Sequence, residues 1–80
     1  MVRIFNLRNN NNIVSFDYYC ENQESERGYV SFNLKTNNIV ESILAPMEAN
    51  AGHELYQTVA IGYARRMLEE KITDKVFCWY

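Results

Sequence analysis

The sequence has few of the residues on which catalytic and metal-binding motifs depend. Its 80 residues include one histidine, two cysteines, three glycines and one proline. A structural zinc site needs about four ligands at characteristic spacings, and His53, Cys20 and Cys78 have no such spacing. The glycines are too scattered to form a phosphate-binding loop. We therefore expect no metal and no cofactor, and a minimal enzyme based on His53 is the weakest of the functional hypotheses.

The sequence also lacks a long apolar run and an excess of positive charge. No segment approaches the roughly 20 apolar residues that span a bilayer, and the N-terminal residues lack the apolar core of a signal peptide. Eight Lys and Arg residues against ten Asp and Glu residues give a net charge of −2, which provides no broad attraction to nucleic acid or anionic lipid. Two cysteines are too few for a disulfide framework. We expect a cytoplasmic protein with reduced thiols, and the abundance of Asn, Ile and Tyr suggests a bacterial source rich in A+T.

What the sequence does contain is enough apolar and aromatic material for one core. The hydrophobic fraction is 48% and the aromatic fraction 14%, and residues 1–80 are short enough to form a single domain. Leucine is scarce, whereas Ile, Val, Tyr and Phe are frequent, and this balance favours β-sheet.

One segment, residues 51–71, has the length and the periodicity of a helix. Five large side chains recur at spacings of three and four, which places them on one face: Leu55, Tyr56, Val59, Tyr63 and Met67. Asn50 is the expected N-cap. Gly62 costs about 1 kcal/mol in a helix relative to Ala, and close approach to a sheet would explain its presence.

The remaining apolar segments are short and predict strands at residues 2–7, 13–20, 28–34, 39–44 and 76–80. Asn-rich segments at 8–12 and 35–38 separate the first strands and predict turns, because Asn tolerates positive φ. One helix and several strands can cover one another only if the helix lies across a sheet. The predicted fold is therefore α+β: an antiparallel four-stranded meander, one long helix on one face and a fifth C-terminal strand, in the order β-β-β-β-α-β.

The first hairpin sets which side chains face the helix. A turn centred on Asn10 and Asn11 would pair Phe5 with Phe16. Together with the alternation in the third strand, this register places the rings of Phe5, Phe16 and Phe32 under the helix. It leaves the opposite face more polar.

The fourth strand allows two registers. A two- or four-residue turn before it would direct Ile39 and Ile43 inward, and a three-residue turn would direct Val40 and Leu44 inward instead.

Two regions are candidates for an interaction surface. Ile61 and Leu68 fall on the helix side opposite Val59, and the aromatic last strand could lie at a sheet edge. Tyr19 and Tyr29 could stand close together on the open face of the sheet, where aromatic side chains pack a partner or stack bases. The full set of candidate residues is Tyr19, Tyr29, Asn33, Ile61, Leu68 and Trp79.

These surfaces lead to two functional hypotheses. The first is a small non-enzymatic interaction or accessory domain that forms a homo-oligomer or binds a protein partner. The second is a module that binds a ligand or single-stranded nucleic acid through Tyr19 and Tyr29. Only Arg3, Arg27 and Lys35 could add positive charge beside these rings, which counts against nucleic acid. A small-molecule ligand is left open, and no membrane partner is expected.

Overall fold

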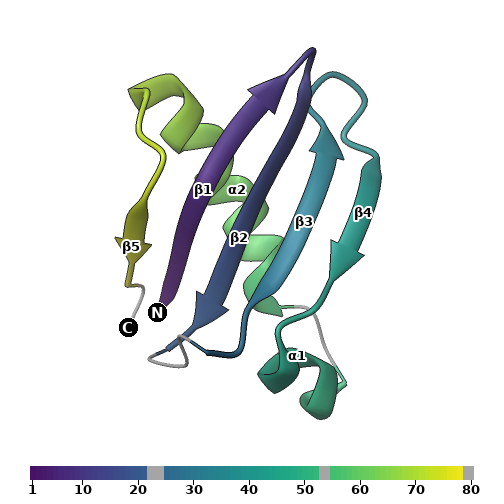
Figure 1. Ribbon diagram of the computed structural model, residues 1–80, viewed down its shortest axis with the longest axis vertical. Coiled ribbons are helices and arrows are strands. Elements are labelled where there is room, and N and C mark those ends of the chain that lie inside the picture. Colours follow the sequence, from purple (N-terminus) through teal and green to yellow (C-terminus); the bar gives the residue numbers. More distant parts are fainter. Residues whose placement is uncertain (22–24, 53–54, 79–80) are drawn as a thin grey trace.

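The computed structural model describes residues 1–21, 25–52 and 55–78. Its elements are β1 (Val2–Asn10), β2 (Ile13–Cys20), β3 (Gly28–Asn33), β4 (Ile39–Ile43), α1 (Pro46–Ala51), α2 (Leu55–Glu70) and β5 (Lys75–Phe77). The strands form one antiparallel sheet in the order β4-β3-β2-β1-β5 (Figure 1). The predicted α+β meander with one long helix and a fifth strand is confirmed.

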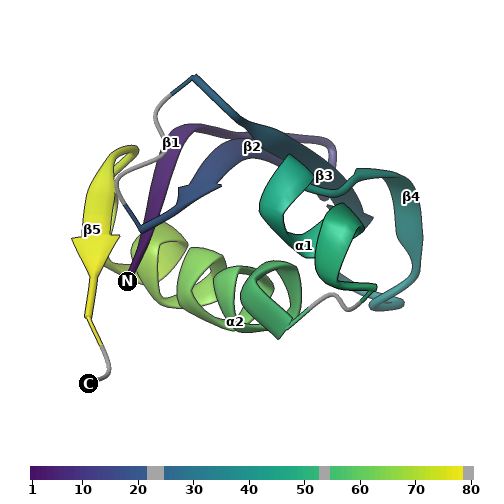
Figure 2. The same cartoon turned by 90° about the horizontal axis from the view of Figure 1, so that it is seen from below.

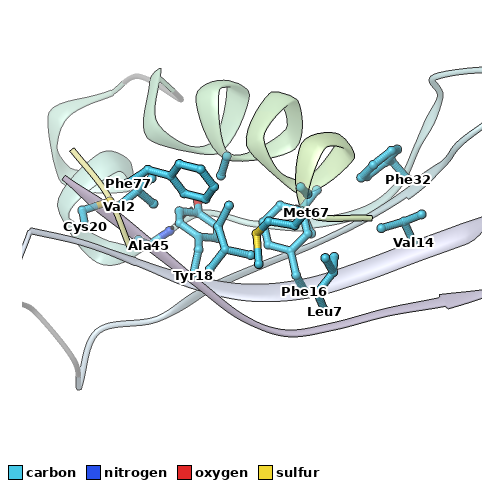
Figure 3. Packing of buried hydrophobic residues seen from close by; sticks show 14 residues of the cluster. Val2, Leu7, Val14, Phe16, Tyr18, Cys20, Phe32, Ala45, Met67 and Phe77 are labelled. Carbon is cyan, nitrogen blue, oxygen red and sulfur yellow. Dashed lines mark hydrogen bonds between the residues drawn. The ribbon is translucent and has the colours of Figure 1, made fainter. Parts of the chain in front are cut away.

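The molecule has two layers. Helix α2 lies along one face of the sheet, α1 lies near the start of β3, and the other face of the sheet is open towards the viewer in Figure 1 (Figures 1 and 2). The core fills the space between the sheet and α2 (Figure 3). It consists of Val2, Ile4, Leu7, Val14, Phe16, Tyr18, Cys20, Val30, Phe32, Ala45, Ala60, Ala64, Met67 and Phe77.

The first hairpin turns one residue later than its sequence predicts. Asn10 pairs with Ile13, and the two turn residues Asn11 and Asn12 have φ values of 51° and 70°. Positive φ at both positions is what the tight type I′ hairpin turn requires. The predicted pairing of Phe5 with Phe16 is therefore wrong.

A β-bulge in β1 then decides which way Phe5 points. Phe5 pairs with Asp17, but Arg8 pairs with Ser15, so the register shifts between them, and Asn6 has a φ of 56°. A bulge adds one residue to its strand, which lets both Ile4 and Leu7 be buried while Phe5 turns to the open face. The expectation that Phe5 lies with Phe16 and Phe32 under the helix is wrong for Phe5 and right for the other two, which are fully buried.

The fourth strand is held by a polar contact. Its residue Ser42 pairs with Val30, on the helix-facing side of β3, and the Ser42 hydroxyl donates a hydrogen bond of 2.8 Å to Oε1 of Gln57 on α2. The register shifts within β4, so neither predicted alternative holds for the whole strand: Ile39 pairs with the inward-facing Phe32, Ile43 pairs with Tyr29 on the open face, and Val40 is 58% exposed.

A short helix, α1, precedes the predicted long helix, which is α2. Pro46 begins α1, because its fixed φ and missing N–H suit the first turn of a helix. Gly52 follows α1 with a φ of 73°, the left-handed conformation that commonly ends helices. Asn50 lies inside α1 rather than at the start of α2, so its predicted role as N-cap of the long helix is wrong.

Helix α2 is also rotated from the predicted orientation. Its fully buried face consists of Gln57, Ala60, Ala64 and Met67. The small Ala side chains allow the helix backbone to approach the sheet, and larger residues then cover the core from both flanks. Ile61 and Leu68 belong to one flank and are partly buried against the core. The prediction that these two residues form a free surface opposite the sheet is wrong.

A buried polar cluster connects four elements around Tyr18. The Tyr18 hydroxyl accepts hydrogen bonds from the backbone N–H of Ala45 at 3.2 Å and from Nε2 of Gln57 at 3.3 Å. Through the contact of Gln57 with Ser42, the cluster links β2, β4, α2 and the start of α1. Buried polar groups are costly when unpaired, so the cluster fixes the relative position of these elements.

The glycines give a direct test of this packing. Gly62 is exposed, and a Cβ at this position would have no neighbour within 4 Å, so the predicted close approach to the sheet is wrong. We expect Gly62→Ala to raise the free energy of unfolding by about 1 kcal/mol, the helix-propensity difference. In a chain of this size that corresponds to a melting temperature roughly 4–8 °C higher, measurable by circular dichroism.

Gly28→Ala is the opposing control. A Cβ at Gly28 would lie 2.4 Å from the Tyr18 ring and 2.7 Å from the backbone N of Ala45. We expect this substitution to lower the free energy of unfolding by about 1–3 kcal/mol, as overpacking does. A destabilised Gly62→Ala protein would contradict the exposed position of this glycine on α2, and an unaffected Gly28→Ala protein would contradict the close packing of Gly28 against Tyr18 and Ala45.

Candidate interaction surfaces

The open face of the sheet carries alternating arginine and aromatic side chains. We call this surface the Arg–aromatic face; it consists of Arg3, Phe5, Arg8, Tyr19, Arg27 and Tyr29. The set comes from β1, β2, β3 and the residue preceding β3. The strand register brings it together, because Phe5, Asp17 and Tyr29 are consecutive partners across three strands.

Phe5 is the centre of one half of this face. The Cζ atoms of Arg27 and Arg3 lie 5.1 Å and 5.4 Å from the centroid of its ring. The ring of Tyr19 is 6.0 Å away at an interplanar angle of 59°. Guanidinium groups at these distances are attracted to the negative face of an aromatic ring. Phe5, which the hairpin prediction placed in the core, is thus part of a polar surface.

The other half of the face is formed by Arg8 and Tyr29. The Cζ atom of Arg8 lies 5.8 Å from the centroid of the Tyr29 ring, and its Nη1 donates a hydrogen bond of 2.7 Å to the backbone oxygen of Asn6. Within the described part of the chain, neither Arg8 nor Arg27 forms an ion pair. These two guanidinium groups therefore carry charge that no described carboxylate neutralises at close range.

Arg3 differs because it is paired. Its Nε and Nη2 donate to the two carboxylate oxygens of Asp74 at 3.0 Å and 2.6 Å, and its Nη1 lies 3.4 Å from the Tyr19 hydroxyl oxygen. The hydrogen bonds from Arg3 hold the pKa of Asp74 below its usual value, and those to Asp74 and Tyr19 raise the pKa of Arg3. This pair ties the segment before β5 to β1.

The open side of the sheet also carries two carboxylates, Asp17 among the rings and Glu41 on β4, opposite Ser31. Asp17 stands between Phe5 and Tyr29 in the strand register, and its Oδ2 accepts a hydrogen bond of 2.9 Å from Nδ2 of Asn6. The bulge residue thus also positions an acidic side chain at the centre of the surface.

The second candidate surface is the outer edge of β4. The exposed large hydrophobic side chains of the described residues lie on the two edge strands: Ile39 (49%), Val40 (58%) and Ile43 (54%) on β4, and Val76 (47%) on β5. The strand β4 has five residues and β5 has three. We refer to Ile39, Val40 and Ile43 together with the outer backbone of their strand as the β4 edge.

The structure places the six predicted surface residues in different environments. Tyr19 and Tyr29 lie on the open face, where Tyr19 is buried and Tyr29 half-buried. The side-chain oxygen of Asn33 accepts backbone hydrogen bonds from Lys35 and Thr36 at 2.9 Å and 3.1 Å, so this residue stabilises the turn before β4.

Two others, Ile61 and Leu68, contribute to neither surface. They pack against the core, and Trp79 lies outside the described residues. Sequence reasoning missed Phe5, Arg8 and the β4 edge. The signal for the first two was Asn6, a residue suited to positive φ inside an apolar strand.

Other kinds of site have no support in the described residues. Among them, no group of three or more His, Cys, Asp or Glu side chains is placed to hold a metal ion. None of the helices in the described ranges has the length and apolar character to span a membrane. Comparisons with protein-family models, curated proteins and solved structures find no significant match. The two surfaces are therefore the basis for any functional assignment.

The Arg3–Asp74 pair gives a prediction for pH dependence. Because the pKa of Asp74 is lowered by folding, the pair stabilises the protein above the unfolded pKa of about 3.9 and stops doing so as the pH falls through the folded pKa. In Arg3→Gln we expect the Asp74 pKa to rise towards its ordinary value, as measured by NMR titration of the carboxyl carbon.

Arg65→Gln is the matched control, because it removes a guanidinium that donates to the side chain of Asn37 instead. It should leave the Asp74 titration unchanged. An Asp74 pKa that is the same with and without Arg3 would contradict the assigned pair.

Proposed function

We propose that the protein is a small interaction module without catalytic activity of its own, and that it associates with a second copy of itself through the β4 edge. A cytoplasmic location is part of this proposal, and the free thiols of Cys20 and Cys78 are compatible with it.

The observation that carries the proposal is the position of the exposed hydrophobic side chains. Of the four large ones among the described residues, three lie on one five-residue edge strand. Scattered exposed hydrophobics need no explanation, but soluble proteins usually protect a sheet edge with lysine, proline or a covering element. The strand β4 has neither lysine nor proline, and its one charged residue is Glu41.

A second copy is the partner that this edge fits best. Two identical edges can pair antiparallel about a two-fold axis, and such an interface is closed and self-complementary. The edge strand β5 has only three residues, which offers fewer backbone hydrogen bonds. The hypothesis of self-association is thus retained, but its proposed location moves from Ile61 and Leu68, or the C-terminal strand, to β4.

Charge restricts the register of the pairing. A two-fold axis at Glu41 would place two carboxylates opposite each other, and like charges in that position are destabilising. An axis at Val40 or at Ser42 separates the two carboxylates. An axis at Val40 also brings the two Val40 side chains together, and β-branched cross-strand pairs are favourable.

The proposal predicts a concentration-dependent dimer that Val40→Lys abolishes. The mass is measured by static light scattering coupled to size-exclusion chromatography, from about 1 µM to about 1 mM. It should rise with concentration towards twice the monomer value, because an interface formed by one short strand is small and small interfaces are weak. Val40 is 58% exposed, so its replacement should leave the monomer fold intact, as checked by circular dichroism.

Val76→Lys is the matched control, since it places the same charge on a valine of the other edge strand that is also about half exposed. It should dimerise like the wild type. A monomer across the whole range would refute the proposal, and a loss of association in Val76→Lys but not in Val40→Lys would move the interface to β5.

A further inference from the structure

We propose that the Arg–aromatic face binds single-stranded nucleic acid. This site is separate from the β4 edge and does not depend on dimerisation.

The face combines aromatic rings with guanidinium groups. Phe5 and Tyr29 stand on β1 and β3, two strand spacings apart, or roughly 10 Å. Proteins that bind single strands without sequence preference combine aromatic side chains, on which bases stack, with positive charge that follows the backbone. The sequence alone suggested only two tyrosines and three scattered cations, and the bulge at Asn6 adds Phe5 and Arg8 to the same face.

The positive charges of two arginines on this face complement the negative charge of a phosphate backbone. Arg8 lies beside Tyr29 and Arg27 beside Phe5, and among the described residues neither has a carboxylate partner. A guanidinium group provides five N–H donors that match phosphate oxygens. Arg3, by contrast, is neutralised by Asp74. The face thus offers two cationic positions, one at each ring.

The position of the rings and of Asp17 favours single strands over duplexes. The rings lie on a sheet face over which Figure 1 draws no helix, and stacking on them requires unpaired bases. Asp17 lies between the rings and would repel a phosphate, so the backbone is directed to the flanks, where Arg8 and Arg27 stand. A rigid duplex with its closely spaced phosphates has no such freedom.

The test is fluorescence anisotropy with a labelled 15-nucleotide oligothymidylate and a duplex of equal length, titrated with the full chain at several salt concentrations. We expect the single strand to bind more tightly than the duplex. Two phosphate contacts predict a slope of about −1.4 for log K against log salt, at about −0.7 per contact. Arg8→Gln and Arg27→Gln should each reduce the slope by about 0.7.

Two further variants separate stacking from charge. Tyr29→Leu should weaken binding by roughly 5- to 150-fold, the loss that stacking of one base implies, without changing the slope. Asp17→Asn should strengthen binding, because it removes the carboxylate between the rings. Both proteins are first checked for folding by circular dichroism.

Arg66→Gln is the matched control, because Arg66 is also exposed and also lies over an aromatic ring, that of Tyr63, but on α2. It should bind like the wild type. The proposal is overturned by absent binding, by equal binding of the duplex, or by equal losses in Arg66→Gln and Arg8→Gln. Equal competition by an oligoglutamate of the same length would assign the face to an acidic protein partner instead.

Discussion

The arrangement of the whole molecule depends on one backbone irregularity, the bulge at Asn6. Without it, strict alternation along β1 would place Ile4 and Leu7 on opposite faces, and a one-residue register shift would exchange the two faces of half the strand. With it, Ile4 and Leu7 are both buried, Phe5 joins the open face and Arg8 reaches Tyr29. The same residue donates to Asp17. The positive φ of Asn6 thus determines which side chains of β1 enter the core and which join the Arg–aromatic face.

The scarcity of glycine explains why asparagine performs this role. Among the described residues, six other than glycine have positive φ: Asn6, Asn11, Asn12, Glu21, Asn37 and Lys71. Asparagine tolerates the left-handed region better than most residues, so it forms both hairpin turns and the bulge. Lys71 ends α2, where the N–H of Ile72 donates to the carbonyl of Met67 and the N–H of Lys71 to that of Leu68, the pattern of a Schellman motif. The chain therefore makes its turns with side chains that can also donate and accept hydrogen bonds.

The sequence predicted the fold class because its strongest signals are local. Alternation in Ile13–Cys20 and in 28–34 identified the inward-facing residues correctly, since the register pairs Phe16 with Val30, which are both buried, and so keeps the inward-facing residues of the two strands on one face. Failures occurred where the outcome depends on long-range packing. The rotation of α2 follows from the close approach of Ala60 and Ala64, whereas a periodicity argument favours the larger side chains around Val59. The contact between Ser42 and Gln57 joins residues that no pattern relates, so the register of β4 had no local signal.

The two proposed surfaces are geometrically compatible, and a dimer formed through β4 would bring two Arg–aromatic faces together. Antiparallel pairing of two β4 strands about an axis perpendicular to the sheet keeps both helices α2 on one side and both open faces on the other. The two Arg–aromatic faces would then belong to one continuous sheet of ten strands, five from each copy. A single face with two free cations binds a polyanion weakly, but two linked faces act on one strand with an effective concentration set by their separation. Dimerisation at β4 would therefore strengthen binding to a long single strand more than binding to a short one, without any new contact to the nucleic acid.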